Sequence, residues 1–208
     1  MTRAELLQIA KPVLFNTEMV KAILEGRKTV TRRCVKSRQP ANIGDILYVR
    51  ETWFVEEYYD DEALIRFKAG GEQGLDYESE GELYHKLNKF AYDKWNPSLF
   101  MPKEAARIFL KVKDVRVERL QDITEEQTEA EGFKFTPPCL SKVSEDGYCD
   151  LDGPCTSKIK YCDMSAGELF GKVLWDSTVN KSDLEQYGWD ANPWVWVIEF
   201  ERIEPEQE

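Results

Sequence analysis

The sequence predicts an α+β fold in a single domain, and three observations support this class. Runs of alternating apolar residues predict strands, most clearly from Ile108 to Leu120 and from Trp194 to Phe200. Helix-capping residues precede several short amphipathic segments. A chain of 208 residues with 42% hydrophobic content is also long enough for one well-cored domain with insertions.

The first predicted helix leads into a cluster of positive charge. Asn16 is a good N-cap, the next apolar residues recur at helical spacing, and Gly26 can end the helix in the left-handed conformation. The octet Gly26-Arg27-Lys28-Thr29-Val30-Thr31-Arg32-Arg33 then contains four cations and two hydroxyls. Cations that follow a helix favour its negative end, which explains one or two of these charges. This helix-end effect does not explain why Lys28 has two threonines, Thr29 and Thr31, close to it in the sequence.

The middle of the chain predicts strands separated by turns. Ile46 to Trp53 has the aromatic and β-branched content of one strand, and Ala63 to Lys68 predicts another. The glycines between residues 70 and 74 predict a hairpin or loop, because they lack the pattern of a phosphate-binding loop. Alternation from Ile108 to Val112, and again at Val115 and Val117, predicts two successive strands, as in a meander or a barrel wall.

Two helices and one strand are predicted in the C-terminal half. Thr124 and Gln127 form a capping box for a short acidic helix that Gly132 ends. The segment from Ser165 to Trp175 predicts an amphipathic helix. The last strand is expected to turn one row of large side chains toward the core, and that row is Trp194, Trp196, Ile198 and Phe200.

The net charge and the lack of long apolar segments argue against two classes of protein, those that bind nucleic acid over a broad surface and those that span a membrane. A formal net charge of -11 argues against broad electrostatic binding of nucleic acid, although it permits a local basic groove. No apolar run approaches the length of a membrane span, and the N-terminus lacks the apolar core of a signal peptide. We therefore expect a cytoplasmic protein with no membrane partner.

The cysteines suggest either a metal site or free thiols. Five cysteines without an export signal favour these alternatives over disulfides. Four of them fall in the irregular segment from Phe133 to Cys162, namely Cys139, Cys149, Cys155 and Cys162. Four thiolates can hold a structural zinc ion and give such a segment a fixed core. The spacing contains no Cys-x-x-Cys knuckle, and reduced free thiols are the alternative.

The octet from Gly26 to Arg33 resembles the Gly-x-Lys-x-x-(Glu/Thr)-x-Arg signature of the ASCH domain. Three other pieces occur in the order of that family: Gly44-Asp45-Ile46-Leu47, Leu120-Gln121-Asp122-Ile123-Thr124, and Trp196-Val197-Ile198-Glu199-Phe200. The resemblance extends from about Lys11 to Ile203 and implies one domain over residues 1–208. That domain would be a PUA-like β-barrel with flanking short helices and insertions at about 54–100 and 133–163. With these two insertions the chain is longer than the smallest members of the family, and in this it is similar to ASCH proteins of bacteriophages and prophages.

The resemblance also implies a reaction. Small bacterial members of the family are amidohydrolases that remove the acyl group from N4-acetylcytidine, using a Thr nucleophile, a Lys base and a Glu acid. The signature places these roles on Thr31, Lys28 and Glu131, and Glu125, Glu126 and Glu129 are alternative acids in the same helix. A Lys can take the Thr proton if neighbouring cations lower its pKa, which we expect of Arg27, Arg32 and Arg33. The chemistry needs no cofactor.

Two other functions fit the same residues. A non-catalytic PUA-like module would bind RNA in the basic cleft, through cations on phosphates and an aromatic ring on a base. The candidate residues for binding a substrate or nucleic acid are Arg27, Arg32, Arg33, Lys36, Arg38 and Trp53. In the third interpretation, a phage accessory protein uses its basic loop to bind a protein partner.

Overall fold

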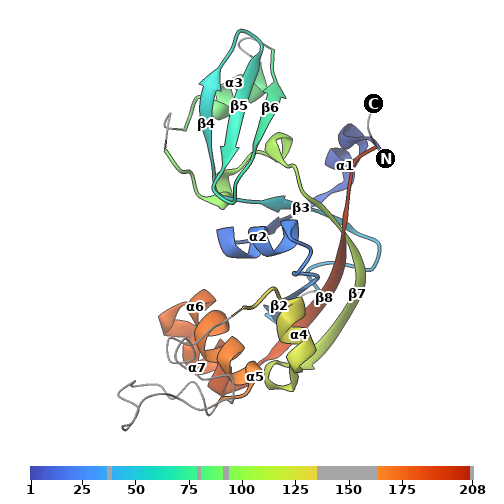
Figure 1. Ribbon diagram of the computed structural model, residues 1–208, viewed down its shortest axis with the longest axis vertical. Coiled ribbons are helices and arrows are strands. Elements are labelled where there is room, and N and C mark those ends of the chain that lie inside the picture. The colour runs from blue at the N-terminus through green and yellow to red at the C-terminus, as the bar shows by residue number, and fades with distance from the viewer. Residues whose placement is uncertain (37–38, 79–80, 91–93, 135–163, 207–208) are drawn as a thin grey trace, which may run out of the picture. The chain divides into compact units, whose positions relative to one another are not determined.

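A computed structural model describes residues 1–36, 39–78, 81–90, 94–134 and 164–206 (Figure 1). The described chain has the predicted α+β composition, with short helices and two sheets. The larger sheet has the strand order β1-β3-β7-β8-β2, and the smaller has the order β4-β5-β6. Strand pairings among the described residues do not close the larger sheet, so the predicted closed barrel is not found.

The strands are β1 (Lys11–Leu14), β2 (Val30–Cys34), β3 (Ile46–Arg50), β4 (Trp53–Tyr58), β5 (Glu62–Phe67), β6 (Glu72–Asp76), β7 (Phe109–Arg119) and β8 (Trp194–Ile203). The α-helices are α1 (Arg3–Ile9), α2 (Thr17–Leu24), α3 (Glu82–Leu87), α4 (Glu125–Ala130), α5 (Ala166–Leu169), α6 (Asp176–Thr178) and α7 (Leu184–Tyr187). The 3-10 turns are η1 (Ser98–Phe100), η2 (Lys103–Ala105), η3 (Leu120–Asp122), η7 (Lys181–Asp183) and η8 (Trp189–Ala191), and η6 (Phe170–Trp175) is π-helical. None of the helices in the described ranges is long and apolar enough to cross a membrane.

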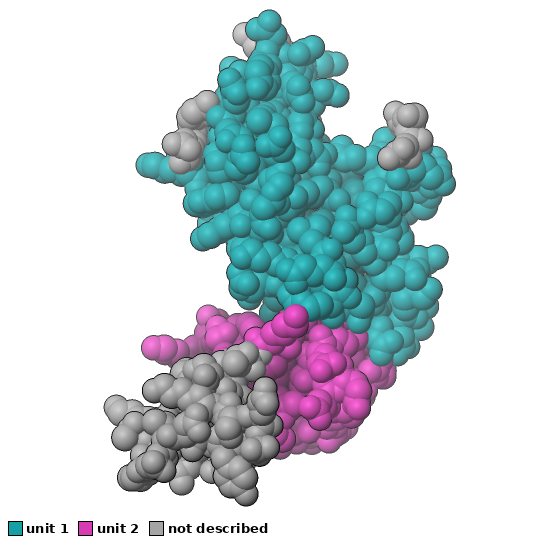
Figure 2. Space-filling view, viewed as in Figure 1, with its two compact units in different colours: residues 1–29, 40–115, 198–208 teal, residues 30–39, 116–197 magenta. Residues whose placement is uncertain are grey.

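The chain groups into two compact units, which Figure 2 shows in different colours. Unit 1 comprises Met1–Thr29, Pro40–Val115 and Ile198–Glu208, and unit 2 comprises Val30–Gln39 and Arg116–Val197. The boundaries fall within β7 and β8, so each of these strands contributes residues to both units.

The predicted strand from Ile46 to Trp53 is in fact two strands of different sheets. β3 ends at Arg50 and pairs with β1 and β7, whereas β4 begins at Trp53 and pairs with β5. Glu51 lies between them and is buried. Its carboxylate accepts hydrogen bonds from Arg107 Nε (2.9 Å) and Nη2 (2.8 Å). Burial raises the pKa of Glu51, and Arg107 opposes that rise. This ion pair lies at the point where the chain leaves the first sheet.

The segment predicted as the first insertion, residues 54–100, contains most of the smaller sheet. β5 and β6 form a hairpin whose turn has positive φ at Gly70 and Gly71, which is the glycine turn that the sequence predicts. One buried face of this sheet shares a core with Leu87 of α3. The part of unit 1 around β4, β5 and β6 therefore has its own two layers (Figure 1).

The helix that precedes the octet is formed as predicted. Asn16 Oδ1 accepts a hydrogen bond from the backbone N–H of Met19 (2.9 Å), and Gly26 has a φ of 74° after the helix end. α1 was not predicted, although its capping box of Thr2 and Glu5 is a recognisable signal.

The two strands predicted between Ile108 and Leu120 are one continuous strand, β7. Asp114 does not break it, because a partly exposed polar side chain is acceptable within a strand. The predicted core face of β8 is correct for Ile198 and Phe200 and wrong for Trp194, which is 50% exposed. Val195 and Val197 are buried instead. The buried face thus changes between residues 197 and 198, where the boundary between the units lies.

Unit 2 contains the two predicted C-terminal helices. The capping box of Thr124 and Gln127 is present in α4. The segment from Ser165 to Trp175 begins as α5 and continues as the π-helical η6. Gly171 in η6 lies against the Trp189 ring, which a Cβ at this position would approach to 2.0 Å. The core of this unit consists of residues from its helices and strands, including Phe170, Trp175, Trp189, Val195 and Val197.

Candidate functional site

The octet from Gly26 to Arg33 is not an exposed basic loop, because half of it is buried, including Lys28, Thr31 and Arg32. Lys28 is 2% exposed, Thr31 1% and Arg32 2%. Lys28 lies near the end of the first segment of unit 1, whereas Thr31 and Arg32 belong to β2 in unit 2. Arg27 is half-buried and forms an ion pair with Glu25 at 2.6 Å. The residues with proposed chemical roles are thus more buried than Arg27 beside them.

Lys28 is held by the turn that follows α2. The backbone N–H groups of Arg27 and Lys28 donate to the carbonyl oxygen of Ala22, at 2.9 and 3.0 Å. The Lys28 Nζ lies 5.5 Å from the centroid of the Phe15 ring, within the range of a cation–π contact. A glycine turn and an aromatic neighbour therefore hold the Lys28 side chain at a position that is almost fully buried.

Arg32 connects β2 with α4 in unit 2. Its side chain is fully buried, and its Nη2 donates to Gln127 Oε1 at 2.7 Å. Its Nη1 donates to Glu131 Oε1 at 3.2 Å, and Nη2 lies 3.6 Å from Glu118 Oε2. A buried guanidinium with these partners cannot also contact the phosphates of an RNA backbone, so the prediction of Arg32 as a phosphate ligand is not supported by its position.

Glu131 differs from the other candidate acids of α4. It is 3% exposed, whereas Glu125, Glu126 and Glu129 are exposed. Glu131 is the C-cap of the helix, and Gly132 follows it with a φ of 77°. Gln127 Oε1, which accepts from Arg32, also accepts from the backbone N–H of Thr124 at 3.1 Å. Arg32 therefore contacts α4 both at its first turn, through Gln127, and at its C-cap, through Glu131.

Thr31 and Arg33 point to the face of β2 opposite Arg32, because side chains alternate along a strand. Burial lowers the pKa of Arg33, and the charge of Glu131 is the main influence that opposes this. The charge of Glu131 therefore acts on a residue of the Thr31 face as well as on Arg32. Burial also raises the pKa of the neighbouring Cys34 thiol.

The other predicted binding residues lie in different surroundings. Trp53 is in the core of unit 1, where its ring packs edge to face on Phe90 with centroids 5.1 Å apart. A side chain with no exposed surface cannot stack on a base, so Trp53 is a core residue. Lys36 is exposed, with its Nζ 4.6 Å from the centroid of the Tyr187 ring. Arg38 lies outside the described residues.

The predicted zinc site also lies outside the described residues, since Cys139, Cys149, Cys155 and Cys162 all fall between residues 135 and 163. Within the described ranges, no group of three or more His, Cys, Asp or Glu residues is arranged to hold a metal ion. The zinc site stays a prediction.

Two residues around the candidate site were missed by sequence reasoning. Gln127 was predicted only as a helix cap and Glu118 was not singled out, yet both face Arg32. The capping box locates Gln127 at the first turn of α4, but its partner in β2 is 95 positions away in the sequence. No local pattern carries that information.

Comparisons of the chain with family models, with curated proteins and with solved structures found no match. The likeness to the ASCH family therefore rests on the sequence signature, and membership of that family stays a prediction.

Proposed function

We propose that this chain is an ASCH-type, PUA-like protein that hydrolyses the amide of an N-acylated cytidine. Thr31 would act as the nucleophile, Lys28 as the base and Glu131 as the acid. The observation that carries the proposal is the burial of all three side chains, at 1%, 2% and 3% exposure. Removing charged groups from water is costly, and buried ionisable groups are concentrated at functional sites.

The chain itself keeps the nucleophile and the base close together. Lys28 and Thr31 are three residues apart, so their Cα atoms are separated by about 11 Å at most. Glu131 is bound to Arg32, the residue next to Thr31. The proposed acid is thus attached to the same strand as the proposed nucleophile.

The proposed reaction has two steps. Thr31 Oγ attacks the acyl carbon while its proton passes to a neutral Lys28 amine. That proton then passes from Lys28 to the Glu131 carboxylate. The bond between the acyl carbon and the exocyclic nitrogen breaks as Glu131 donates the proton to that nitrogen, which releases cytidine. Water then hydrolyses the ester on Thr31, and the acyl group leaves as a carboxylic acid.

The same positions weaken the interpretation as an RNA-binding module. That function requires exposed cations along a groove and an accessible aromatic ring. Arg32 is bound to Gln127 and Glu131, and Trp53 is in a core. A small substrate needs neither residue at the surface.

Turnover of N4-acetylcytidine by purified variants, followed by chromatography of the released cytidine, tests the proposal. We expect Thr31→Val, Lys28→Met and Glu131→Gln each to lower the rate by about 100-fold or more, since each removes a group that takes part in proton transfer or bond formation. Matched controls are available at exposed or half-exposed positions nearby: Thr29→Val, Lys21→Met and Glu129→Gln. These should stay within about twofold of the wild-type rate.

Circular dichroism would verify that each variant is folded. The absence of turnover by the wild-type chain, or an equal rate for Thr31→Val and Thr29→Val, would refute the proposed chemistry.

A further inference from the structure

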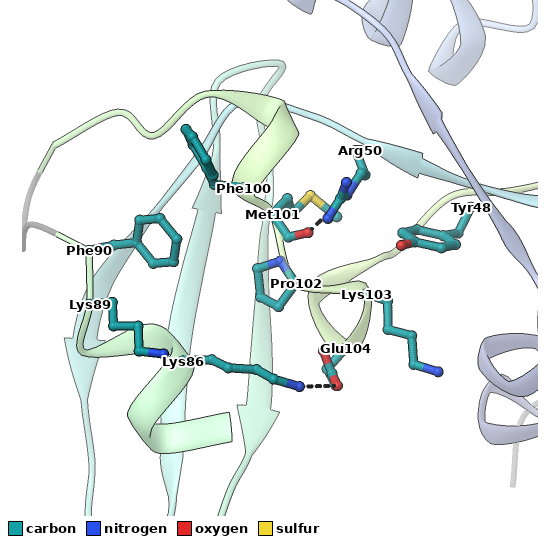
Figure 3. Close-up of a pocket in the computed structure, with 10 residues that line it drawn as sticks. All are labelled: Tyr48, Arg50, Lys86, Lys89, Phe90, Phe100, Met101, Pro102, Lys103 and Glu104. Atoms are coloured by element: carbon teal, nitrogen blue, oxygen red, sulfur yellow. Dashed lines mark hydrogen bonds and ion pairs between the residues drawn. The ribbon is translucent and has the colours of Figure 1, made fainter. Parts of the chain in front are cut away.

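Unit 1 contains a pocket of about 390 Å³ that has no part in the proposed hydrolysis. Its walls come from the end of β3, from the residues at and after the end of α3, and from the segment of η1 and η2 (Figure 3). This volume lies within the usual range of small-molecule sites.

The pocket carries an excess of positive charge in an acidic protein. Four cations line it, Arg50, Lys86, Lys89 and Lys103, together with one carboxylate, Glu104. Lys86 is already committed, because its Nζ lies 2.9 Å from Glu82 and 3.5 Å from Glu104. Lys103 Nζ donates to the carbonyl oxygen of Leu7. The pocket therefore has a net positive lining even when its own carboxylate is counted.

Arg50 and Lys89 retain donors for a ligand. Arg50 Nε donates to the carbonyl oxygen of Met101 at 3.1 Å, which orients the guanidinium. Within the described part of the chain, no hydrogen bond or ion pair is recorded for the two terminal amino groups of Arg50 or for the ammonium group of Lys89. Such donors suit a phosphate, which accepts several charge-assisted hydrogen bonds.

Aromatic side chains form the other part of the wall. The rings of Phe90 and Phe100 have centroids 6.1 Å apart, and Figure 3 shows both at the same end of the pocket. Phe100 is 53% exposed. An exposed aromatic ring beside uncommitted cations is the combination that binds a flat base and its phosphate.

We infer that this pocket binds a nucleoside monophosphate, with the base against Phe90 and Phe100 and the phosphate among the cations. The inference goes beyond the proposed hydrolysis, which uses no residue of the pocket. It would give the chain a second site for the same class of molecule.

Calorimetric titration of the full chain with cytidine 5′-monophosphate, cytidine and inorganic phosphate tests the inference. We expect the nucleotide to bind at least about tenfold more tightly than either fragment, because only the nucleotide uses both parts of the wall. Higher ionic strength should weaken binding of the nucleotide but not of cytidine.

Two pairs of variants locate the binding. Phe100→Ala should weaken nucleotide binding at least about fivefold through loss of stacking, and Leu99→Ala, equally exposed beside it, should not. Lys89→Gln should weaken binding about threefold or more, whereas Lys111→Gln, exposed on β7 outside the pocket, should not.

Three results would overturn the inference: no nucleotide binding up to about 1 mM, equal affinity for cytidine and the nucleotide, or no difference between Phe100→Ala and Leu99→Ala. Thr31→Val separates the two proposals, because it should abolish hydrolysis and leave nucleotide binding intact. Loss of nucleotide binding in Thr31→Val would place the ligand at β2 and refute the pocket assignment, and nucleotide binding without any hydrolysis would refute the proposed function alone.

Discussion

Arg32 joins three parts of unit 2 through one guanidinium group. It contacts Gln127 at the first turn of α4, Glu131 at the helix end, and Glu118 on β7. Breaking a buried ion pair by removing one partner leaves an uncompensated charge, which costs far more than losing a surface pair. Because Arg32 is buried and bound to Glu131, it holds the carboxylate of the proposed acid in place.

We predict that Arg32→Met lowers the free energy of unfolding by about 3 kcal/mol, because the buried Glu131 loses this partner. Arg66→Met is the matched control. Arg66 also contacts two carboxylates, Glu56 and Glu72, but its side chain is 41% exposed, and such exposed pairs contribute little to stability. Urea denaturation of both variants measures the difference. Equal losses would show that Arg32 does not support Glu131.

At the residue scale, the sequence predicted the helix-capping residues correctly but did not predict which charged residues are buried. Asn16, Gly26, Thr124 and Gln127 were predicted correctly, since capping depends on residues within one turn. The burial of Arg32 was not predicted, because it depends on pairing with a helix about a hundred positions later. The same reason explains why Glu131 could not be distinguished from Glu129 by sequence alone.

At the element scale, η6 depends on a close contact between a glycine and an aromatic ring. Gly171 leaves room for Trp189, whose backbone N–H donates to Asp176 Oδ1 at 2.7 Å. Trp175 Nε1 donates in turn to the carbonyl oxygen of Tyr187. Both hydrogen bonds lie on the C-terminal side of Gly171, and they fix the end of the helical segment to the residues around Trp189.

We predict that Gly171→Ala destabilises the protein by about 3 kcal/mol, because its Cβ would lie 2.0 Å from the Trp189 ring and the ring must move. Gly167→Ala, one turn earlier in α5, is the control, since its Cβ would meet its nearest neighbour at 3.3 Å. Its cost should be at least about 2 kcal/mol smaller, as alanine also favours the helix. Thermal denaturation compares the two variants, and a Gly171→Ala protein as stable as Gly167→Ala would contradict the contact.

The elements that were predicted incorrectly share a cause. The strand from Ile46 to Trp53 is divided by the buried pair of Glu51 and Arg107, residues far apart in sequence. The strand β7 runs without interruption from Phe109 to Arg119, although the local pattern suggests a break at Asp114. Periodicity identifies a strand but not its sheet, and so it could not distinguish the open sheet from a barrel.

At the scale of the whole molecule, negative charge opposes compactness. The net charge of -11 is spread over 39 acidic and 28 basic residues, and repulsion of this kind destabilises the folded state. Surface ion pairs contribute too little to stability to offset that repulsion.

We predict that the urea midpoint rises when the ionic strength is raised from about 0.01 M to about 0.15 M, since the Debye length falls from about 30 Å to about 8 Å. A variant with Asp60→Asn, Glu129→Gln and Glu185→Gln, all exposed positions, should show a smaller rise. A midpoint that falls with salt would indicate that favourable ion pairs outweigh the repulsion.

The central claim concerns a covalent step on Thr31, and trapping that step tests it most directly. The chain would be mixed with N4-acetylcytidine, quenched in acid within the first turnover, and digested for mass spectrometry. The proposed function predicts that the peptide containing Thr31 gains the mass of one acetyl group, and that Thr31→Val does not. Release of cytidine with no acetylated peptide, or acetylation that persists in Thr31→Val, would contradict the assignment of Thr31 as the nucleophile.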